Sequence, residues 1–255
     1  MKNIGIKIVL ITARMYSSTR YISNVIEADY GVFGNGSNIM NLNNLSIYYN
    51  EIIPYNILKK LILFGKNNGL YIHLNELLCE TSDEKKYFTL KHLILNQNYP
   101  EELKSNINLV NNINDYIKEN SKIVKIIFVS ENNMDEIYFQ LKEKFPNIFI
   151  NEYSKNLYES TINKKINYIE VGIKNNNKAD GLTRLIKKLH IEPDEVIVIG
   201  DGDNDIDMFK KFKNSGCLLN GSKLAKENAS YISKFTNNKS GVSEIINYFV
   251  QRGQK

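Results

Sequence analysis

Cysteine is scarce in this sequence, and its scarcity excludes two kinds of stabilising site. The 255 residues include only Cys79 and Cys217, which stand far apart and show no Cys-x-x-Cys or Cys/His spacing. The sequence therefore predicts neither a disulfide framework nor a zinc site. We expect both cysteines to be small buried apolar residues.

Long apolar runs are also missing. The longest, such as Ile6–Ile11 and Val196–Ile199, are broken within a few residues, far short of the roughly 20 residues that cross a bilayer. The apolar start of the chain runs into Thr12 without a plausible signal-peptidase site. We therefore expect a cytoplasmic protein that does not interact with membranes.

No dense block of one charge stands out, although the formal net charge is +5. Lysines are spread along the chain among asparagines and isoleucines, which predicts no nucleic-acid partner. A hydrophobic content of 42% at this length is enough for one large domain or two smaller ones. No pattern in the sequence fixes the number of subunits.

Three short apolar runs have the character of buried parallel strands, because each ends in small or polar residues. They are Ile6–Ile11, Tyr30–Phe33 and Val196–Ile199. Amphipathic stretches follow each run or separate them, which predicts an α/β fold with a doubly wound parallel sheet. These stretches are residues 17–27, 181–189 and 205–213. Ligands of such sheets bind beyond the carboxyl ends of the strands.

The middle of the chain, residues 41–173, predicts a separate α+β domain inserted into the first. Expected strands cover residues 46–49, 70–74 and 123–130, and expected helices cover residues 54–66, 100–107 and 134–145. Residues 1–40 and 174–255 would then form the core domain.

The strongest chemical signal is a cluster of carboxylates directly after the strand Val196–Ile199, in the segment Asp201–Asp207. Ionised aspartates repel one another, so such a cluster predicts a hard cation such as Mg²⁺. A calcium loop of the EF-hand type is disfavoured, because Ile206 and Phe212 stand where that loop needs Gly and Glu. The competing interpretation is a polar turn that caps the next helix, and Asp203 and Asp207 could have only that role.

The segment Gly200–Met208, with the sequence Gly-Asp-Gly-Asp-Asn-Asp-Ile-Asp-Met, resembles the fourth motif of Cof-type phosphatases in the haloacid dehalogenase (HAD) superfamily. The resemblance implies that Asp201 and Asp205 serve the Mg²⁺ site, Asp205 also being catalytic, and that Asn204 contacts the substrate phosphate. Lys178 resembles the lysine of the third motif, which offsets the charge of the transferring phosphoryl group. Taken alone, Lys178 would be interpreted as a solvated surface charge.

Two further segments resemble parts of the same phosphate site. Thr12-Ala13-Arg14 resembles the second motif, in which a catalytic hydroxyl, here Thr12, and free backbone N–H groups meet the phosphate. The family usually has Gly where Ala13 stands. Asn35-Gly36 resembles a substrate-binding turn after the next strand, and Asn220 stands where another site asparagine is common. Each segment could also be an ordinary turn or helix cap.

The first motif of the family, Asp-x-Asp-Gly-Thr, is absent from the sequence. In the family it supplies the nucleophile, so we expect this chain to be inactive by the family mechanism and to be truncated, with the first strand and helix missing. That strand would lie between those ending at Thr12 and Asp201, and its loss would leave two central edges unpaired.

The resemblance implies a HAD-like Rossmannoid core with a large inserted cap domain and the Mg²⁺-dependent hydrolysis of small phosphorylated metabolites of the sugar-phosphate type. The alternative is a noncatalytic protein that binds a phosphorylated metabolite.

Overall fold

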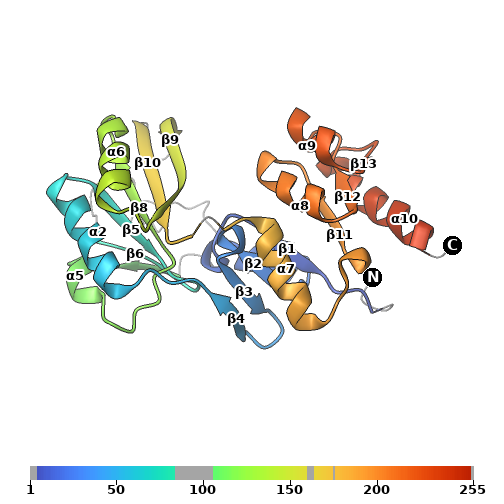
Figure 1. Ribbon diagram of the computed structural model, residues 1–255, viewed down its shortest axis with the longest axis horizontal. Coiled ribbons are helices and arrows are strands. Elements are labelled where there is room, and N and C mark those ends of the chain that lie inside the picture. The colour runs from blue at the N-terminus through green and yellow to red at the C-terminus, as the bar shows by residue number, and fades with distance from the viewer. Residues whose placement is uncertain (1–4, 84–105, 160–163, 175, 254–255) are drawn as a thin grey trace.

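The computed structural model describes residues 5–83, 106–159, 164–174 and 176–253 of the chain. Its strands form three sheets. Figure 1 shows the sheet β1–β4 in the middle, the sheet β5–β10 at one end and the sheet β11–β13 at the other. In this described part, no helix has the length and apolar character needed to cross a membrane.

The middle sheet is built from strands in the order β1 (Val9–Ile11), β2 (Tyr30–Phe33), β3 (Asn38–Asn41) and β4 (Ile47–Asn50). Strands β1 and β2 are parallel, and the hairpin strands β3 and β4 are antiparallel to their neighbours. Between β1 and β2 the chain forms the short helices η2 (Tyr16–Ser18) and α1 (Arg20–Val25). The turn η3 (Gly34–Gly36) follows β2.

The C-terminal sheet is fully parallel and has the order β11 (Ile197–Gly200), β12 (Asn214–Cys217) and β13 (Tyr231–Ile232). Its accompanying helices are α8 (Ile206–Lys211), α9 (Lys223–Asn228) and α10 (Gly241–Gly253), with the turns η4 (Pro193–Glu195), η5 (Asp203–Asp205) and η6 (Asn237–Lys239). Cys217 is completely buried here, whereas Cys79 is only half-buried. The prediction of a buried apolar role is confirmed for Cys217.

Strands β1 and β11 are both edge strands of their sheets. Within the described ranges, β1 pairs only with β2 and β11 pairs only with β12. Each therefore has one side without a neighbouring strand among the described residues. Ile11 on β1 nevertheless packs against the apolar cluster of the C-terminal part.

The third sheet has the order β7-β6-β5-β8-β10-β9 and belongs to the inserted cap domain. Its strands are β5 (Tyr71–Asn75), β6 (Glu80–Ser82), β7 (Ile107–Leu109), β8 (Lys125–Ser130), β9 (Phe149–Glu159) and β10 (Lys164–Gly172). Helices α2 (Tyr55–Asn67), α5 (Ile113–Tyr116) and α6 (Asp135–Lys144) lie beside it (Figure 1). The apolar side of α2, with Leu58, Leu61 and Ile62 at helical spacing, packs on Phe128 of β8 in one buried cluster.

Most sequence-predicted elements are present, with shifted ends. Strands β1, β2, β5, β8 and β11 and helices α2, α6, α7 (Lys178–Leu189) and α8 fall within the predicted ranges or extend them by a few residues. Most of the helix expected over residues 100–107 lies outside the described residues. Strand β4 was assigned to the cap from the sequence, whereas it pairs with β3 in the middle sheet. A five-residue connection, residues 42–46, makes the two strands a local hairpin, so the sheets change after Asn50.

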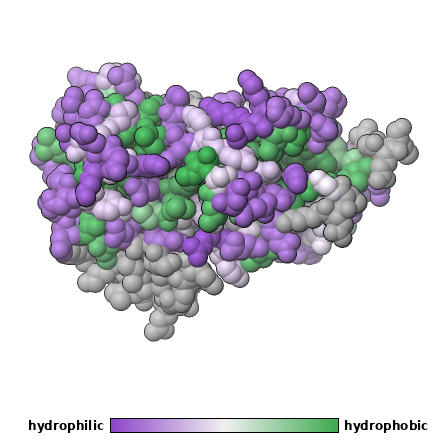
Figure 2. Space-filling view, turned by 90° about the horizontal axis from the view of Figure 1, so that it is seen from below, coloured by the Kyte–Doolittle hydropathy of each residue, from purple (hydrophilic) through white to green (hydrophobic). Residues whose placement is uncertain are grey.

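Figure 2 shows that hydrophilic residues cover most of the visible described surface and that apolar residues form separate patches among them. The buried apolar side chains form four clusters inside the protein. Helix α7 links two of them, because Leu182 and Ile186 pack toward β11 and α8 while Leu185 packs toward β2 and β3. This helix therefore fixes the middle sheet relative to the C-terminal sheet.

Candidate phosphate site

The loop after β11 is held by the buried carboxylate of Asp205. Its Oδ2 accepts hydrogen bonds from the backbone N–H groups of Asp201 and Gly202, each at 3.0 Å. A Cβ on Gly200 would lie 2.3 Å from this oxygen, so a larger residue would displace Asp205. The sequence places glycine where the carboxylate must approach the backbone.

Lys178 at the start of α7 forms the charged centre of the site. Its Nζ lies 2.6 Å from Oδ1 of Asp205 and donates a hydrogen bond of 3.2 Å to Oδ1 of Asn204. Lys178 is only 7% exposed and Asp205 only 4%. The structure thus brings together three residues that the sequence predicts for this site, and Lys178 is not a solvated surface charge.

Two glycines determine where Lys178 lies. Gly36 has φ +97°, and a Cβ there would lie 2.5 Å from the carbonyl oxygen of Asn177. A Cβ on Gly181 would lie 2.6 Å from Cα of Gly36. The turn η3 and the first turn of α7 therefore touch through their backbones. Asn177 caps the helix by accepting a hydrogen bond of 2.8 Å from Asp180 N–H.

The turn Thr12–Arg14 lies beside the turn Gly34–Asn35 at the ends of β1 and β2. The N–H of Asn35 donates to the carbonyl of Thr12 at 3.1 Å, and the N–H of Gly34 donates to the carbonyl of Arg14 at 3.0 Å. The hydroxyl of Thr12 accepts from Arg14 N–H at 3.1 Å. The sequence predicted these two turns as separate parts of one phosphate site, and their hydrogen bonds hold them together.

A cavity of about 160 Å³ lies next to Lys178. From the core it is lined by Asn35, Asn176, Asn177, Lys178, Asn204 and Asp207, and from the cap by Phe149 and Asn151. The Oδ1 atom of Asn35 is buried without a hydrogen-bond partner, and the residue has a left-handed backbone with φ 53°. An unpaired buried acceptor beside a cation is suited to a ligand that brings a donor, such as a hydroxyl group.

The remaining expected residues are farther from this cavity or have other partners. Asn220 is exposed and its Oδ1 accepts a hydrogen bond of 2.9 Å from Asn237 N–H, so the structure shows a loop-stabilising contact for it. Of the other expected residues, those that do not line the cavity are Thr12, Ala13, Arg14, Gly36, Asp201 and Asp205. Sequence reasoning missed Phe149 and Asn151 as site residues, because only the folded cap brings β9 over the core. It also missed Asn176, which lies on the connection from β10 to α7.

The carboxylates partly fit a magnesium site. Asp201 is exposed at the end of β11, where its oxygens are open to a cation, whereas Asp205 is committed to Lys178 and two backbone N–H groups. Among the described residues, no three His, Cys, Asp or Glu side chains converge on one metal position. Mg²⁺ commonly takes only one or two carboxylates together with water and substrate phosphate oxygens, so Asp201 suits one ligand of such a shell.

Cys217 is not a substitute nucleophile for this site. It is fully buried at the end of β12, behind the Asp201 loop. Burial raises the pKa of its thiol above the ordinary value, and Lys226 offsets only part of this effect. The residue therefore stays a thiol, which is unreactive compared with a thiolate.

A strand-end carboxylate loop, a buried lysine and a cap inserted after β4, the fourth strand of the chain, define an α/β fold of the HAD type. The chain matches the model of the haloacid dehalogenase-like hydrolase family over residues 1–246. It belongs to this family. The match covers both the core and the cap, so the predicted family and fold class are confirmed.

Known relatives agree with this assignment. The chain is 31% identical over 123 residues to the 5-amino-6-(5-phospho-D-ribitylamino)uracil phosphatase YbjI of Escherichia coli, covering 45% of this chain and 44% of that protein. It is 33% identical over 104 residues to the phosphatase YcsE of Bacillus subtilis, covering 41% of each. These matches span less than half of the length of the curated relatives. The crystal structure of TM0651 from Thermotoga maritima shares the fold with a TM-score of 0.77 at 20% identity, covering 96% of this chain and 86% of that one.

Proposed function

We propose that this protein acts on small phosphorylated metabolites of the sugar-phosphate type, as a Mg²⁺-dependent phosphatase of the HAD family. The observation that carries the proposal is the buried Nζ of Lys178, held by Asp205 and Asn204 at the edge of a cavity between core and cap. A buried cation with one carboxylate partner keeps hydrogen-bonding capacity for an incoming anion. The relatives named as phosphatases of a phosphorylated ribityl compound support this substrate class.

Each residue of the site has a role in this proposal. Lys178 binds the phosphoryl oxygens and offsets their charge. The hydroxyl of Thr12 and the backbone N–H of Ala13 donate hydrogen bonds to the phosphate, whereas the N–H groups of Thr12 and Arg14 already bond to the Val32 carbonyl and the Thr12 hydroxyl. Asn35 and Asn204 lie beside the bound phosphate. Asp205 orients Lys178 and the loop after β11. Asp201 would hold Mg²⁺, which when bound polarises a phosphoryl oxygen.

This chemistry also needs a group that attacks the phosphorus atom. The resemblance to Cof-type phosphatases implies an aspartate nucleophile in an Asp-x-Asp-Gly-Thr motif, and the printed sequence contains no such motif. Cys217, at the end of β12, is buried and protonated. We therefore propose that the residues described here bind and stabilise the phosphoryl group without attacking it. Because the sequence contains no Asp-x-Asp-Gly-Thr motif, a noncatalytic protein that binds a phosphorylated metabolite is the second candidate.

The two candidates differ in turnover. The test is Mg²⁺-dependent hydrolysis of p-nitrophenyl phosphate by the 255-residue chain and by a form extended upstream in frame. The Asp201→Ala and Lys178→Met variants of each form are assayed in the same way. Hydrolysis by the extended form alone, lost in both variants, supports the phosphatase. Orthophosphate binding without hydrolysis by either form supports the binding protein. Absence of both binding and hydrolysis in the folded protein contradicts both candidates.

A further inference from the structure

Arg184 lies on the side of helix α7 that faces the turn η3. It stands three residues after Gly181, whose Cα region approaches Gly36 closely, so Gly181 and Arg184 are neighbours on one face of the helix. Its Nη1 atom donates a hydrogen bond of 3.2 Å to the carbonyl oxygen of Gly36 and one of 3.3 Å to Oδ1 of Asn176. One arginine therefore joins the turn after β2 to the segment that leads into α7.

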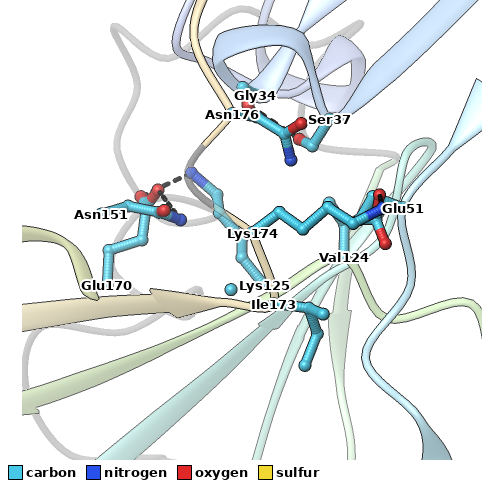
Figure 3. A pocket seen from close by; sticks show the side chains of 11 residues that line it. Gly34, Ser37, Glu51, Val124, Lys125, Asn151, Glu170, Ile173, Lys174 and Asn176 are labelled. Carbon is cyan, nitrogen blue, oxygen red and sulfur yellow. Dashed lines mark hydrogen bonds and ion pairs between the residues drawn. The ribbon is translucent and has the colours of Figure 1, made fainter. Parts of the chain in front are cut away.

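Both acceptors of Arg184 belong to segments that line the cavity beside Lys178. Asn35, directly before Gly36, lines this cavity, and so does Asn176. Asn176 also lines a smaller cavity of about 10 Å³ under the cap, which has room for about one water molecule (Figure 3). Since an arginine side chain can only donate, Asn176 accepts through Oδ1, and its amino group keeps two N–H donors for a ligand or a water molecule.

The guanidinium group of Arg184 is itself held in place by an aromatic ring. Its Cζ lies 4.7 Å from the centre of the Tyr49 ring on β4, a cation–π contact. The Tyr49 hydroxyl donates a hydrogen bond to Oε2 of Glu51, which also pairs with Nζ of Lys174 at 2.9 Å. Burial and the hydrogen bond to Glu51 raise the pKa of Tyr49 above its ordinary value, so the hydroxyl stays protonated at neutral pH. Glu51 follows β4 and Lys174 follows β10, so this network begins at the two connections between core and cap.

We infer that Arg184 is a positioning residue of the phosphate site, which fixes the turn Asn35–Gly36 and the side chain of Asn176 against the helix that carries Lys178. The inference rests on the proposed function. Arg184 is not among the described residues that line the cavity, so it acts through Asn176 and the turn and does not touch the phosphate. Without its guanidinium group, binding must also order these groups, and that cost lowers the affinity for phosphate.

The test is isothermal titration of the folded 255-residue chain with orthophosphate. Arg184→Met keeps the aliphatic stem but removes the donors, and it should weaken binding roughly 3- to 10-fold. Arg184→Lys keeps the charge but loses the planar, longer donor group, so it should also bind more weakly than the unchanged protein. It supplies the comparison if Arg184→Met does not fold.

Lys188→Met is the matched control. Lys188 lies one turn further along α7, and its Nζ lies 4.6 Å from the centre of the Tyr48 ring. The substitution therefore removes one positive charge and one cation–π contact from the same helix. It should leave the affinity for orthophosphate unchanged.

A double-mutant cycle separates positioning from a general loss of stability. Asn176→Ala should weaken orthophosphate binding by itself, and it should cost less affinity in Arg184→Met, where the amide is already released. Circular dichroism checks that each variant is folded at the temperature of the titration.

Two outcomes would overturn the inference while the proposed function stands. The first is that Arg184→Met or Arg184→Lys binds orthophosphate as tightly as the unchanged protein, because the contacts are then dispensable or the charge alone matters. The second is that Asn176→Ala has the same effect with and without Arg184. If the unchanged folded chain does not bind orthophosphate, or if Lys178→Met binds it equally well, the proposed function fails, and the inference fails with it.

Discussion

Replacing Asp205 by alanine is the substitution to which the phosphate site should be most sensitive. The side chains of Asp205 and Lys178 are only 6% and 9% exposed, and they lie 2.6 Å apart. Asp205→Ala leaves the ammonium group of Lys178 buried with Asn204 as its remaining partner. It also removes the acceptor of two backbone N–H groups in the loop after β11, those of Asp201 and Gly202.

The expected magnitude follows from these contacts. Removing one partner of a buried ion pair typically costs about 3–5 kcal/mol, because the other charge is left uncompensated. The two backbone N–H groups lie near the surface, where water replaces Asp205, so they add little. For a chain of this size, a loss of that magnitude lowers Tm by roughly 6–20 °C.

Thermal unfolding followed by circular dichroism measures this loss. Asp203→Ala is the matched control, because Asp203 is an exposed carboxylate in the same loop that accepts a hydrogen bond from the hydroxyl of Ser222. Its effect should stay below about 1 kcal/mol. The double variant Lys178→Met/Asp205→Ala should recover part of the stability, since it removes the unpaired charge. A loss of less than about 1 kcal/mol for Asp205→Ala, no larger than that of the surface control, would refute the reasoning. So would a double variant that recovers no stability.

Two further predictions concern backbone packing and pH. Gly36→Ala should lower Tm and weaken orthophosphate binding, because the added Cβ would lie 2.5 Å from the carbonyl oxygen of Asn177 at a φ of +97°. Thermal unfolding measures Tm and titration calorimetry measures the affinity. Unchanged values would contradict the close approach of Gly36 to Asn177. Burial raises the pKa of Glu80 in the cap above its ordinary value of 4.5, an effect that Glu170 reinforces and Lys125 partly offsets. Ionising Glu80 therefore costs stability, and that cost grows as pH rises above 4.5. Glu80→Gln should be more stable than the unchanged protein at neutral pH, and the difference should vanish in acid. Urea unfolding at neutral pH and at a pH below 4.5 measures the two stabilities. A difference that does not depend on pH would contradict the raised pKa of Glu80.

The sequence predicts strands that are continuous apolar runs better than strands whose apolar residues alternate with polar ones. Buried parallel strands such as Tyr30–Phe33 and Val196–Ile199 are continuous apolar runs, so they can be recognised in the sequence alone. Strands β9 and β10 were not predicted. Their apolar residues alternate with lysine, asparagine and glutamate, because one side of the strands faces solvent, and a composition rich in these residues hides that alternation.

The residues of the candidate site also fall into two groups, those that motifs predict and those that only the folded cap brings to the site. Lys178, Asn204 and Asp205 were predicted from motifs, and their short contacts agree with that prediction. Phe149 and Asn151 line the cavity only because the cap folds over the core, and no local pattern marks them. Asn220 shows the opposite case, since it stands in a motif-like position but its side chain stabilises the loop at Asn237.

Orthophosphate binding to the folded chain tests the central claim most directly. Titration calorimetry should compare the unchanged protein with Lys178→Met and with Lys211→Met. Lys211 is a half-exposed lysine that pairs with Asp180 on the surface. Loss of a charge-assisted contact predicts that Lys178→Met weakens binding roughly 10- to 100-fold, whereas Lys211→Met leaves it unchanged. If the protein does not bind orthophosphate, or if Lys178→Met binds it as well as the unchanged protein does, Lys178 is not the centre of a phosphate site.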